Sequence, residues 1–221
     1  MRVAPSQAVE DYLKAIFRLG SEAGVVTASA LAGRLGVASP SATGMLHRLE
    51  AAGLVSRGED HSVVLTPAGR SAALRVVRRH RLIETFLHAV VGVPWHEVHD
   101  EAEVLEHALS ERLEARIDEL LGHPTHDPHG DPIPPVDGEG HTEAWPHRLL
   151  DVPPGSTLQV ERVSDDDAAA LVHLAELGLV PGVPVTVDRL DPFDGPLWVE
   201  VDGRRHALGR GLARMVSGSV R

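Results

Sequence analysis

The sequence predicts a mostly α-helical protein with small β elements, built from three parts. Apolar residues recur at helical spacing through most of the first 121 residues. Two short β-forming runs follow the third helical segment, and after residue 150 the pattern changes to short runs that alternate apolar and polar residues. We therefore expect domains at residues 1–72, 73–140 and 151–221, the last one after a loop rich in Pro and His.

The composition limits both the chemistry and the location that we expect. The 221-residue chain contains no cysteine, which excludes disulfides and thiolate metal sites and leaves oxygen and nitrogen atoms as the expected ligands. No apolar run is long enough for a membrane span, and none follows a basic stub as in an export signal. The protein is therefore expected to be cytoplasmic, without membrane contact.

Charge is divided unevenly along the chain, whose net charge is −11. Residues 1–91 carry 11 Lys or Arg against 7 Asp or Glu, whereas residues 92–221 carry 10 against 25. The basic first part is typical of a segment that meets phosphate, and the acidic remainder is typical of one that holds cations.

Three helices are predicted at the start of the chain. Ser6 and Thr27 stand at positions typical of N-caps for the first two. Ser39 is expected to cap the third helix, with Pro40 at its first helical position and Gly53 at its end.

These helices and two short strands, residues 54–57 and 63–66, around the polar turn GEDHS predict a winged helix-turn-helix. The helix that starts at Ser39 would enter a DNA major groove. The residues expected to lie at DNA are Ser39, Pro40, Ser41, Thr43, Gly44, Arg48, Arg57 and His61. The alternative is the same fold used for protein contacts or as a scaffold.

The segment VHDEAEVLEHALS, residues 98–110, is the strongest candidate for binding chemistry. Read as a helix, it places four polar side chains on one face: His99, Glu103, Glu106 and His107. Solvent, salt bridges or a metal ion would each satisfy such a row. His80 and Glu84, four residues apart on a long helix predicted over residues 66–91, add two more potential ligands.

The helix predicted over residues 110–121 carries an apolar stripe that consists of Leu113, Ile117, Leu120 and Leu121. Together with the preceding long helix, this stripe predicts a helical dimerisation domain. Palindromic DNA sites are read by two-fold dimers, so we expect a homodimer.

Residues 122–150 contain six prolines and five histidines without periodicity, which predicts a loop. Within it, DPHGDPIP is either an inert turn or a way to bring Asp127 and His129 to a metal. The remaining residues predict a small SH3-like β-barrel with one inserted helix over residues 165–177, and they show no catalytic constellation.

Six motifs carry a family resemblance: VEDYL near the start, SPSATGMLHRLEAAGLV in the winged helix, TPAGR, RRHRLIETFL, VHDEAEVLEHALS and PHGDPIP. Together they resemble the DtxR/MntR family of metal-dependent transcriptional repressors. The likeness covers about the first 135 residues. The C-terminal part looks like the SH3-like, or FeoA-like, domain of the three-domain members.

The resemblance implies two metal sites. The primary site would consist of Asp11, His80, Glu103, Glu106 and His107. The second site would consist of Glu84, Asp127, His129 and an acid from the C-terminal domain, for which we choose Asp167. His99 is an alternative ligand, because the iron-type members use it in their second site.

The resemblance also bears on which metal is bound. Iron-type repressors have Met and Cys where this chain has Asp11 and Glu103, and the two carboxylates match the manganese-type regulators. An oxygen-rich site predicts Mn²⁺, with Fe²⁺ next and other divalent first-row metals bound in vitro. The chain departs from two-domain manganese regulators at Lys14, where these have Glu.

The implied function is repression of metal-uptake and metal-homeostasis genes by a metal-loaded homodimer that binds double-stranded operator DNA. An iron-dependent repressor of the same family is one alternative, and a winged-helix regulator of an organic ligand is another. The sequence has no HExxH motif, Ser/His/Asp arrangement or Gly-rich phosphate loop, so neither enzyme activity nor a small-molecule substrate is expected.

Overall fold

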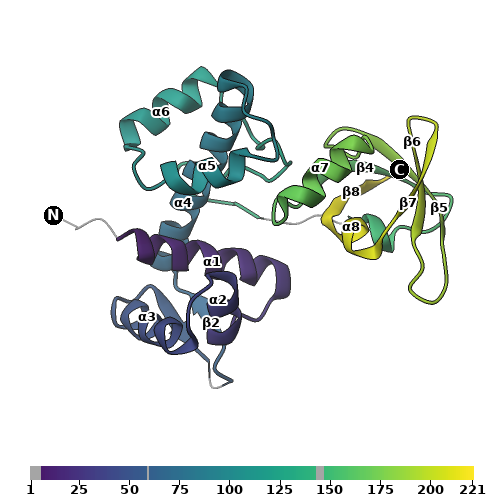
Figure 1. Ribbon diagram of the computed structural model, residues 1–221. Helices are drawn as coiled ribbons and strands as arrows, with labels where there is room; N and C mark the ends of the chain where they lie inside the picture. Colours follow the sequence, from purple (N-terminus) through teal and green to yellow (C-terminus); the bar gives the residue numbers. More distant parts are fainter. Residues whose placement is uncertain (1–5, 59, 143–146) are drawn as a thin grey trace. The chain divides into compact units, whose positions relative to one another are not determined.

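The computed structural model, drawn in Figure 1, describes residues 6–58, 60–142 and 147–221. The chain divides into two compact units. The first unit consists of Met1–His80, Leu105–Ser110 and Pro134–Thr142. The second consists of Arg81–Val104, Glu111–Ile133 and Glu143–Arg221.

The first unit begins with a winged helix-turn-helix, as predicted. Its helices are α1 (Gln7–Ala23), α2 (Ala28–Arg34) and α3 (Ser39–Ala51), which Figure 1 shows grouped with the small sheet. In this sheet β1 (Val55–Arg57) pairs antiparallel with β2 (Val63–Leu65). Glu59, in the predicted turn between the strands, lies outside the described residues.

One apolar face of each helix forms the core of this unit. The exposed fraction is at most 2% for Leu13 and Ile16 of α1, Leu31 of α2, and Leu46 and Leu49 of α3. Residues three apart on a helix lie on the same side, so the pairs in α1 and α3 each point to one core. Burial of such a side chain contributes roughly 1.5–3 kcal/mol relative to exposure. The opposite face of α3 is left to solvent.

Local sequence determines where these helices begin and end. The Thr27 hydroxyl accepts a hydrogen bond of 3.2 Å from the Ala30 N–H, as expected of an N-cap. α3 starts one residue earlier than predicted, because Ala38 is its N-cap and Ser39 is already helical. Gly53 follows α3 with φ +70°, a conformation that glycine adopts without a steric penalty.

The predicted long helix is α4 (Pro67–Phe86), which supplies residues to both units. Its end widens into a π-helical segment, Leu87–Val91, and Gly92 terminates it with φ +84°. Two shorter helices follow, α5 (Val98–Leu105) and α6 (Glu111–Leu120).

The helix predicted over residues 98–110 is wrong at its C-terminal end, because α5 stops at Leu105. The Ala108 N–H donates to the Leu105 carbonyl at 3.0 Å, so a tight turn replaces the next helical turn. Glu106 and His107 lie in this turn, where their side chains bond to residues of α1 and α4. Tertiary contacts of this kind override local periodicity.

Among the described residues, the C-terminal part of the second unit forms a six-stranded antiparallel sheet in the order β3-β8-β4-β5-β6-β7. Its strands are β3 (His147–Arg148), β4 (Thr157–Val163), β5 (Pro184–Leu190), β6 (Leu197–Val201), β7 (Arg204–Leu208) and β8 (Val216–Val220). The inserted helix of the prediction is α7 (Ala168–Glu176). α8 (Arg210–Met215), β3 and a 3-10 turn over Leu149–Asp151 are additional to the prediction.

Candidate metal centre

Three segments of the first unit bring carboxylate and imidazole groups together. α1 supplies Asp11, α4 supplies His80, and the turn after α5 supplies Glu106 and His107. Asp11, Glu106 and His107 each place one possible ligand atom within 4.8 Å of the other two. The structure therefore brings together three members of the predicted primary site.

His107 lies between two carboxylates of α1. Its Nε2 is 2.8 Å from Asp11 Oδ1, and its Nδ1 is 2.8 Å from Glu10 Oε2. Arg79 lies on the other side of Glu10, with 3.8 Å between its Nη1 and Glu10 Oε1. Glu10 was not among the predicted site residues, although its position next to Asp11 was a signal in the sequence.

Glu106 is fully enclosed in this centre, since its side chain is 0% exposed. Its Oε2 lies 2.6 Å from Nδ1 of His80, whose side chain is also fully buried. Its Oε1 lies 2.6 Å from the ammonium of Lys14, a residue of α1. A buried carboxylate with these neighbours is fixed in position before any ligand arrives.

The donor chemistry of this centre fits a divalent first-row metal. Carboxylate oxygens and imidazole nitrogens suit Mn²⁺ and Fe²⁺, and no soft sulfur ligand is among the grouped residues described by the structure. The buried position of Glu106 adds a second reason, because a carboxylate without water is stabilised by a nearby cation.

Glu103, the remaining member of the predicted primary site, belongs to the second unit. It lies on α5 with its side chain 38% exposed, and 3.6 Å separates its Oε1 from Nε2 of His99.

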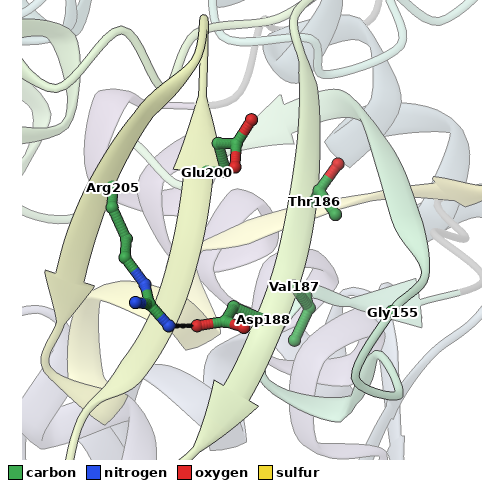
Figure 2. Close-up of a pocket in the computed structure, with 6 residues that line it drawn as sticks. All are labelled: Gly155, Thr186, Val187, Asp188, Glu200 and Arg205. Carbon is green, nitrogen blue, oxygen red and sulfur yellow. Dashed lines mark ion pairs between the residues drawn. The ribbon is translucent and has the colours of Figure 1, made fainter.

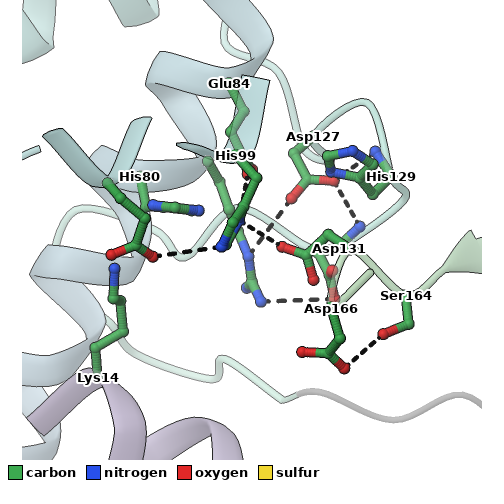
Figure 3. Close-up of polar contacts among 12 residues, drawn as sticks. Lys14, His80, Glu84, His99, Asp127, His129, Asp131, Ser164 and Asp166 are labelled. Carbon is green, nitrogen blue, oxygen red and sulfur yellow. Dashed lines mark hydrogen bonds and ion pairs between the residues drawn. The ribbon is translucent and has the colours of Figure 1, made fainter. Parts of the chain in front are cut away.

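The second unit contains a separate group of potential ligands around Glu84. His99 Nδ1 lies 3.3 Å from Glu84 Oε1 and 3.0 Å from Asp165 Oδ2. Figure 3 shows Glu84 and His99 side by side, with Asp127 and His129 near them. Glu84, Asp127 and His129 also have ligand atoms within 4.8 Å of one another, and all three residues are buried.

Asp127 is a carboxylate surrounded by other carboxylates. Its Oδ1 accepts hydrogen bonds of 2.9 Å from the backbone N–H groups of His129 and Asp131. Burial raises the pKa of Asp127 well above its ordinary value, and the negative charges of Asp131 and Glu84 raise it further. A bound cation would offset this repulsion.

The tautomer of His129 is fixed by its surroundings. Its Nε2 lies 2.8 Å from the carbonyl oxygen of Trp95, and a carbonyl can only accept a hydrogen bond, so Nε2 carries the proton. Nδ1 is then a lone-pair donor, and it is buried without a hydrogen-bond partner among the described residues. A neutral imidazole whose second nitrogen donates to a carbonyl is typical of a metal-ligating histidine.

Backbone packing holds this loop in place. Gly130 has φ +91°, and a Cβ there would lie 1.8 Å from the Glu161 carbonyl oxygen, so only glycine fits. The Val163 N–H donates to the His129 carbonyl at 2.9 Å, which ties the loop to β4. The loop DPHGDPIP is thus an anchored turn that carries two potential ligands, Asp127 and His129.

Asp167, the predicted fourth member of the second site, has another role. Its Oδ1 accepts hydrogen bonds from the N–H groups of Ala169 (2.9 Å) and Ala170 (3.1 Å), so it is the N-cap of α7. The acid that lies against His99 is Asp165, two residues earlier. The run of three Asp at residues 165–167 was the signal in the sequence, but the helix start decides which member turns inward.

The residues predicted to meet DNA lie along the solvent face of α3 and at the wing. Ser39, Pro40, Ser41, Gly44, Arg48 and His61 are exposed. Thr43 is half-buried, and its hydroxyl donates to the Ser39 carbonyl at 3.0 Å. Arg57 is half-buried as well, with 3.6 Å between its Nε and Glu50 Oε2. Small exposed residues at the start of α3 permit close approach to base edges.

A pocket of about 350 Å³ lies on the C-terminal sheet (Figure 2). Its lining residues are Gly155, Thr186, Val187, Asp188, Glu200 and Arg205. Asp188 and Arg205 form an ion pair across it. Because these two charges neutralise each other, the pair favours neither an anionic nor a cationic ligand.

Within the described ranges, no helix is both long enough and apolar enough to cross a membrane.

Three domain families match the chain. The N-terminal DNA-binding domain of iron-dependent repressors matches residues 6–63, and their metal-binding and dimerisation domain matches residues 66–135. The FeoA domain matches residues 147–219.

Curated relatives include the iron-dependent repressor IdeR of Mycobacterium tuberculosis, which is 35% identical over 190 residues, covering 81% of this chain and 83% of the relative. The diphtheria toxin repressor of Corynebacterium diphtheriae is 36% identical over 137 residues, 61% of each chain.

Solved structures with the same fold include a manganese-dependent transcriptional repressor in complex with manganese. It is 41% identical, with a TM-score of 0.91 over 96% of this chain and 100% of that one. The IdeR of T. acidophilum is 30% identical, with a TM-score of 0.80 over the full length of both chains.

Proposed function

The chain belongs to the DtxR-type family of iron-dependent repressors, and from that premise we propose that Mn²⁺ is the metal to which it responds. As a member of this family, it is a metal-dependent, DNA-binding transcriptional repressor that controls metal homeostasis genes. The observation that carries the metal dependence is the grouping of Asp11, Glu106 and His107 between the first helix and the turn after α5.

The choice of Mn²⁺ is supported by the donor set. Asp11 offers an oxygen where a softer sulfur ligand would favour other metals, and the chain has no cysteine at all. The solved repressor with 41% identity is named as manganese-dependent and holds manganese, which adds support. Fe²⁺ is the second candidate, because the curated relative IdeR is named as an iron-dependent repressor.

We propose a primary centre that consists of Asp11, His80, Glu103, Glu106 and His107, with Glu103 included on the family resemblance alone. We propose a second centre that consists of Glu84, His99, Asp127, His129 and Asp165, with Asp165 in place of Asp167. The lone pair on His129 Nδ1 and the mutual repulsion of the buried carboxylates support the second centre.

The proposed division of labour follows the chain. Residues 1–72 would bind double-stranded operator DNA through α3, residues 73–140 would hold metal and form a homodimer, and residues 151–221 would form the FeoA-like domain. In a two-fold dimer the two copies of α3 read half-sites about 34 Å apart, one turn of DNA. We propose a cytoplasmic location, because a repressor must reach chromosomal DNA. We propose no catalytic role.

Within the first unit, the residues of the primary centre connect α1 to α4 and to the turn after α5. Asp11 lies on α1, which packs against the core that also supports α3, and His107 holds Asp11 at 2.8 Å. A bound divalent cation supplies the positive charge that such clustered carboxylates need. Glu106, fixed by His80 and Lys14, gives the turn after α5 a defined position against α1.

Fluorescence anisotropy of a labelled DNA duplex, selected from a random library by the metal-loaded protein, tests this function. Chelated protein should bind weakly, and Mn²⁺ should restore tight binding at free concentrations that are ordinary for Mn²⁺ in cells. Zn²⁺ and anaerobic Fe²⁺ are titrated in turn for comparison. Glu106→Ala and His107→Ala should lose this metal response, about tenfold to hundredfold or more in metal affinity, while circular dichroism shows intact helices.

A regulator that responds to an organic ligand predicts a different result. Its DNA binding would be the same with and without chelator, and both variants would bind like the unchanged protein.

A further inference from the structure

Lys14 is a buried lysine inside the primary centre. Its side chain is 7% exposed, and its Nζ lies 2.6 Å from Oε1 of Glu106, whose side chain is 0% exposed. An ammonium removed from water is costly to the fold unless a close opposite charge compensates it. A carboxylate that served only as a metal ligand would not require a lysine beside it.

Both oxygens of Glu106 already have a partner. Lys14 contacts Oε1, and His80 Nδ1 lies 2.6 Å from Oε2. A divalent cation that binds Glu106 must therefore share an oxygen with one of these groups or displace it. The competitor at Oε1 is the ammonium of Lys14, a cation like the metal that would bind there.

The charge balance of the centre points the same way. Three carboxylates, those of Glu10, Asp11 and Glu106, lie near the permanent positive charges of Lys14 and Arg79. Lys14 is one of only two Lys or Arg side chains in these contacts, so without it Arg79 alone would face the three carboxylates.

We infer that Lys14 is a resident counter-cation, which stabilises the metal-free centre and weakens its affinity for divalent metal. It thereby sets the metal concentration at which the repressor responds. The inference rests on the proposed function, since it concerns the same centre. Like charges a few ångströms apart in a buried site repel strongly, so the ammonium that holds Glu106 in the absence of metal opposes the incoming cation.

The test compares Lys14→Met with the Lys14 protein, both in full-length chains that carry His129→Ala so that the other centre is not titrated. The chelated Lys14→Met protein should melt about 5–15 °C lower, because buried Glu106 loses its counter-charge. Calorimetric titration with Mn²⁺ should show binding about tenfold to hundredfold tighter. Lys14→Arg keeps the charge and should keep the original Mn²⁺ affinity.

These two changes have opposite signs, which a merely structural lysine would not produce. Unchanged or weaker Mn²⁺ binding in Lys14→Met overturns the inference. If that variant does not fold without metal, Lys14→Gln, which keeps a donor but no charge, gives the same comparison. His107→Ala separates the two proposals: it should lose Mn²⁺ affinity, and if it does not, the centre itself is wrong and Lys14 has no metal to oppose.

Discussion

Asp127 is a buried carboxylate whose charged form is disfavoured by its surroundings. It is 8% exposed, and burial raises its pKa, as do the charges of Asp131 and Glu84. Arg81 opposes the shift, with 3.7 Å between its Nε and Asp127 Oδ2. A carboxylate that is destabilised in its charged form by its own protein is typical of a ligand site.

This raised pKa predicts how the stability of the metal-free protein depends on pH. The folded state keeps a proton on Asp127 that the unfolded state has released, so the free energy of unfolding falls as pH rises from about 4 through the raised pKa. Asp127→Asn should flatten this fall and raise the melting temperature at pH 7. Thermal unfolding of both chelated proteins at several pH values measures how stability depends on pH. If stability falls equally with pH in the variant, Asp127 is not the residue responsible.

The start of α7 gives two nearby aspartates different contacts. Asp167 caps the helix, whereas Asp165 lies 3.0 Å from His99 in the second centre. Asp167→Ala should lower the free energy of unfolding by about 1 kcal/mol and leave Mn²⁺ affinity unchanged. Asp165→Ala should weaken Mn²⁺ binding at the second centre by about tenfold or more.

Calorimetric titration and denaturant unfolding of both variants provide the comparison, and each aspartate serves as the control for the other. Weaker metal binding in Asp167→Ala with normal binding in Asp165→Ala would restore the sequence-based choice of ligand.

Local sequence was enough to predict most elements and too little to predict their ends. α1 and α4 follow from apolar spacing, and the start of α2 follows from the Thr27 cap. α5 stops at Leu105 because Glu106 bonds to residues far away in the chain, which periodicity cannot register. α8 escaped prediction because its six residues are too few to show a helical period.

The candidate site was predictable to a similar depth. Glu106 and His107 were predicted as metal ligands because their motif resembles that of the family. The structure groups these two residues with Asp11. The contacts of Lys14 and Asp165 depend on tertiary packing that no spacing rule contains.

At the scale of the whole molecule, the uneven charge predicts how DNA binding responds to salt. Residues 1–91 have a net excess of basic residues although the chain is acidic overall, so phosphate contacts should come from this part. Arg48→Ala, on the exposed face of α3, should weaken binding to all duplexes and reduce the slope of log affinity against log salt by about 0.9 for each subunit of the dimer. Arg116→Ala, at an exposed position on α6, is the matched control. Equal slopes in the two variants would contradict the assigned DNA surface.

Metal binding and operator binding should be coupled, because one protein binds both ligands. Thermodynamic linkage requires each ligand to tighten the other by the same factor, about 5- to 150-fold for typical couplings. The most direct measurement is the dissociation constant for Mn²⁺ with and without a saturating selected duplex, beside the constant for the duplex with and without Mn²⁺. We predict that the two ratios are equal and well above one. An Mn²⁺ affinity that DNA does not change would show that the two binding events are not coupled.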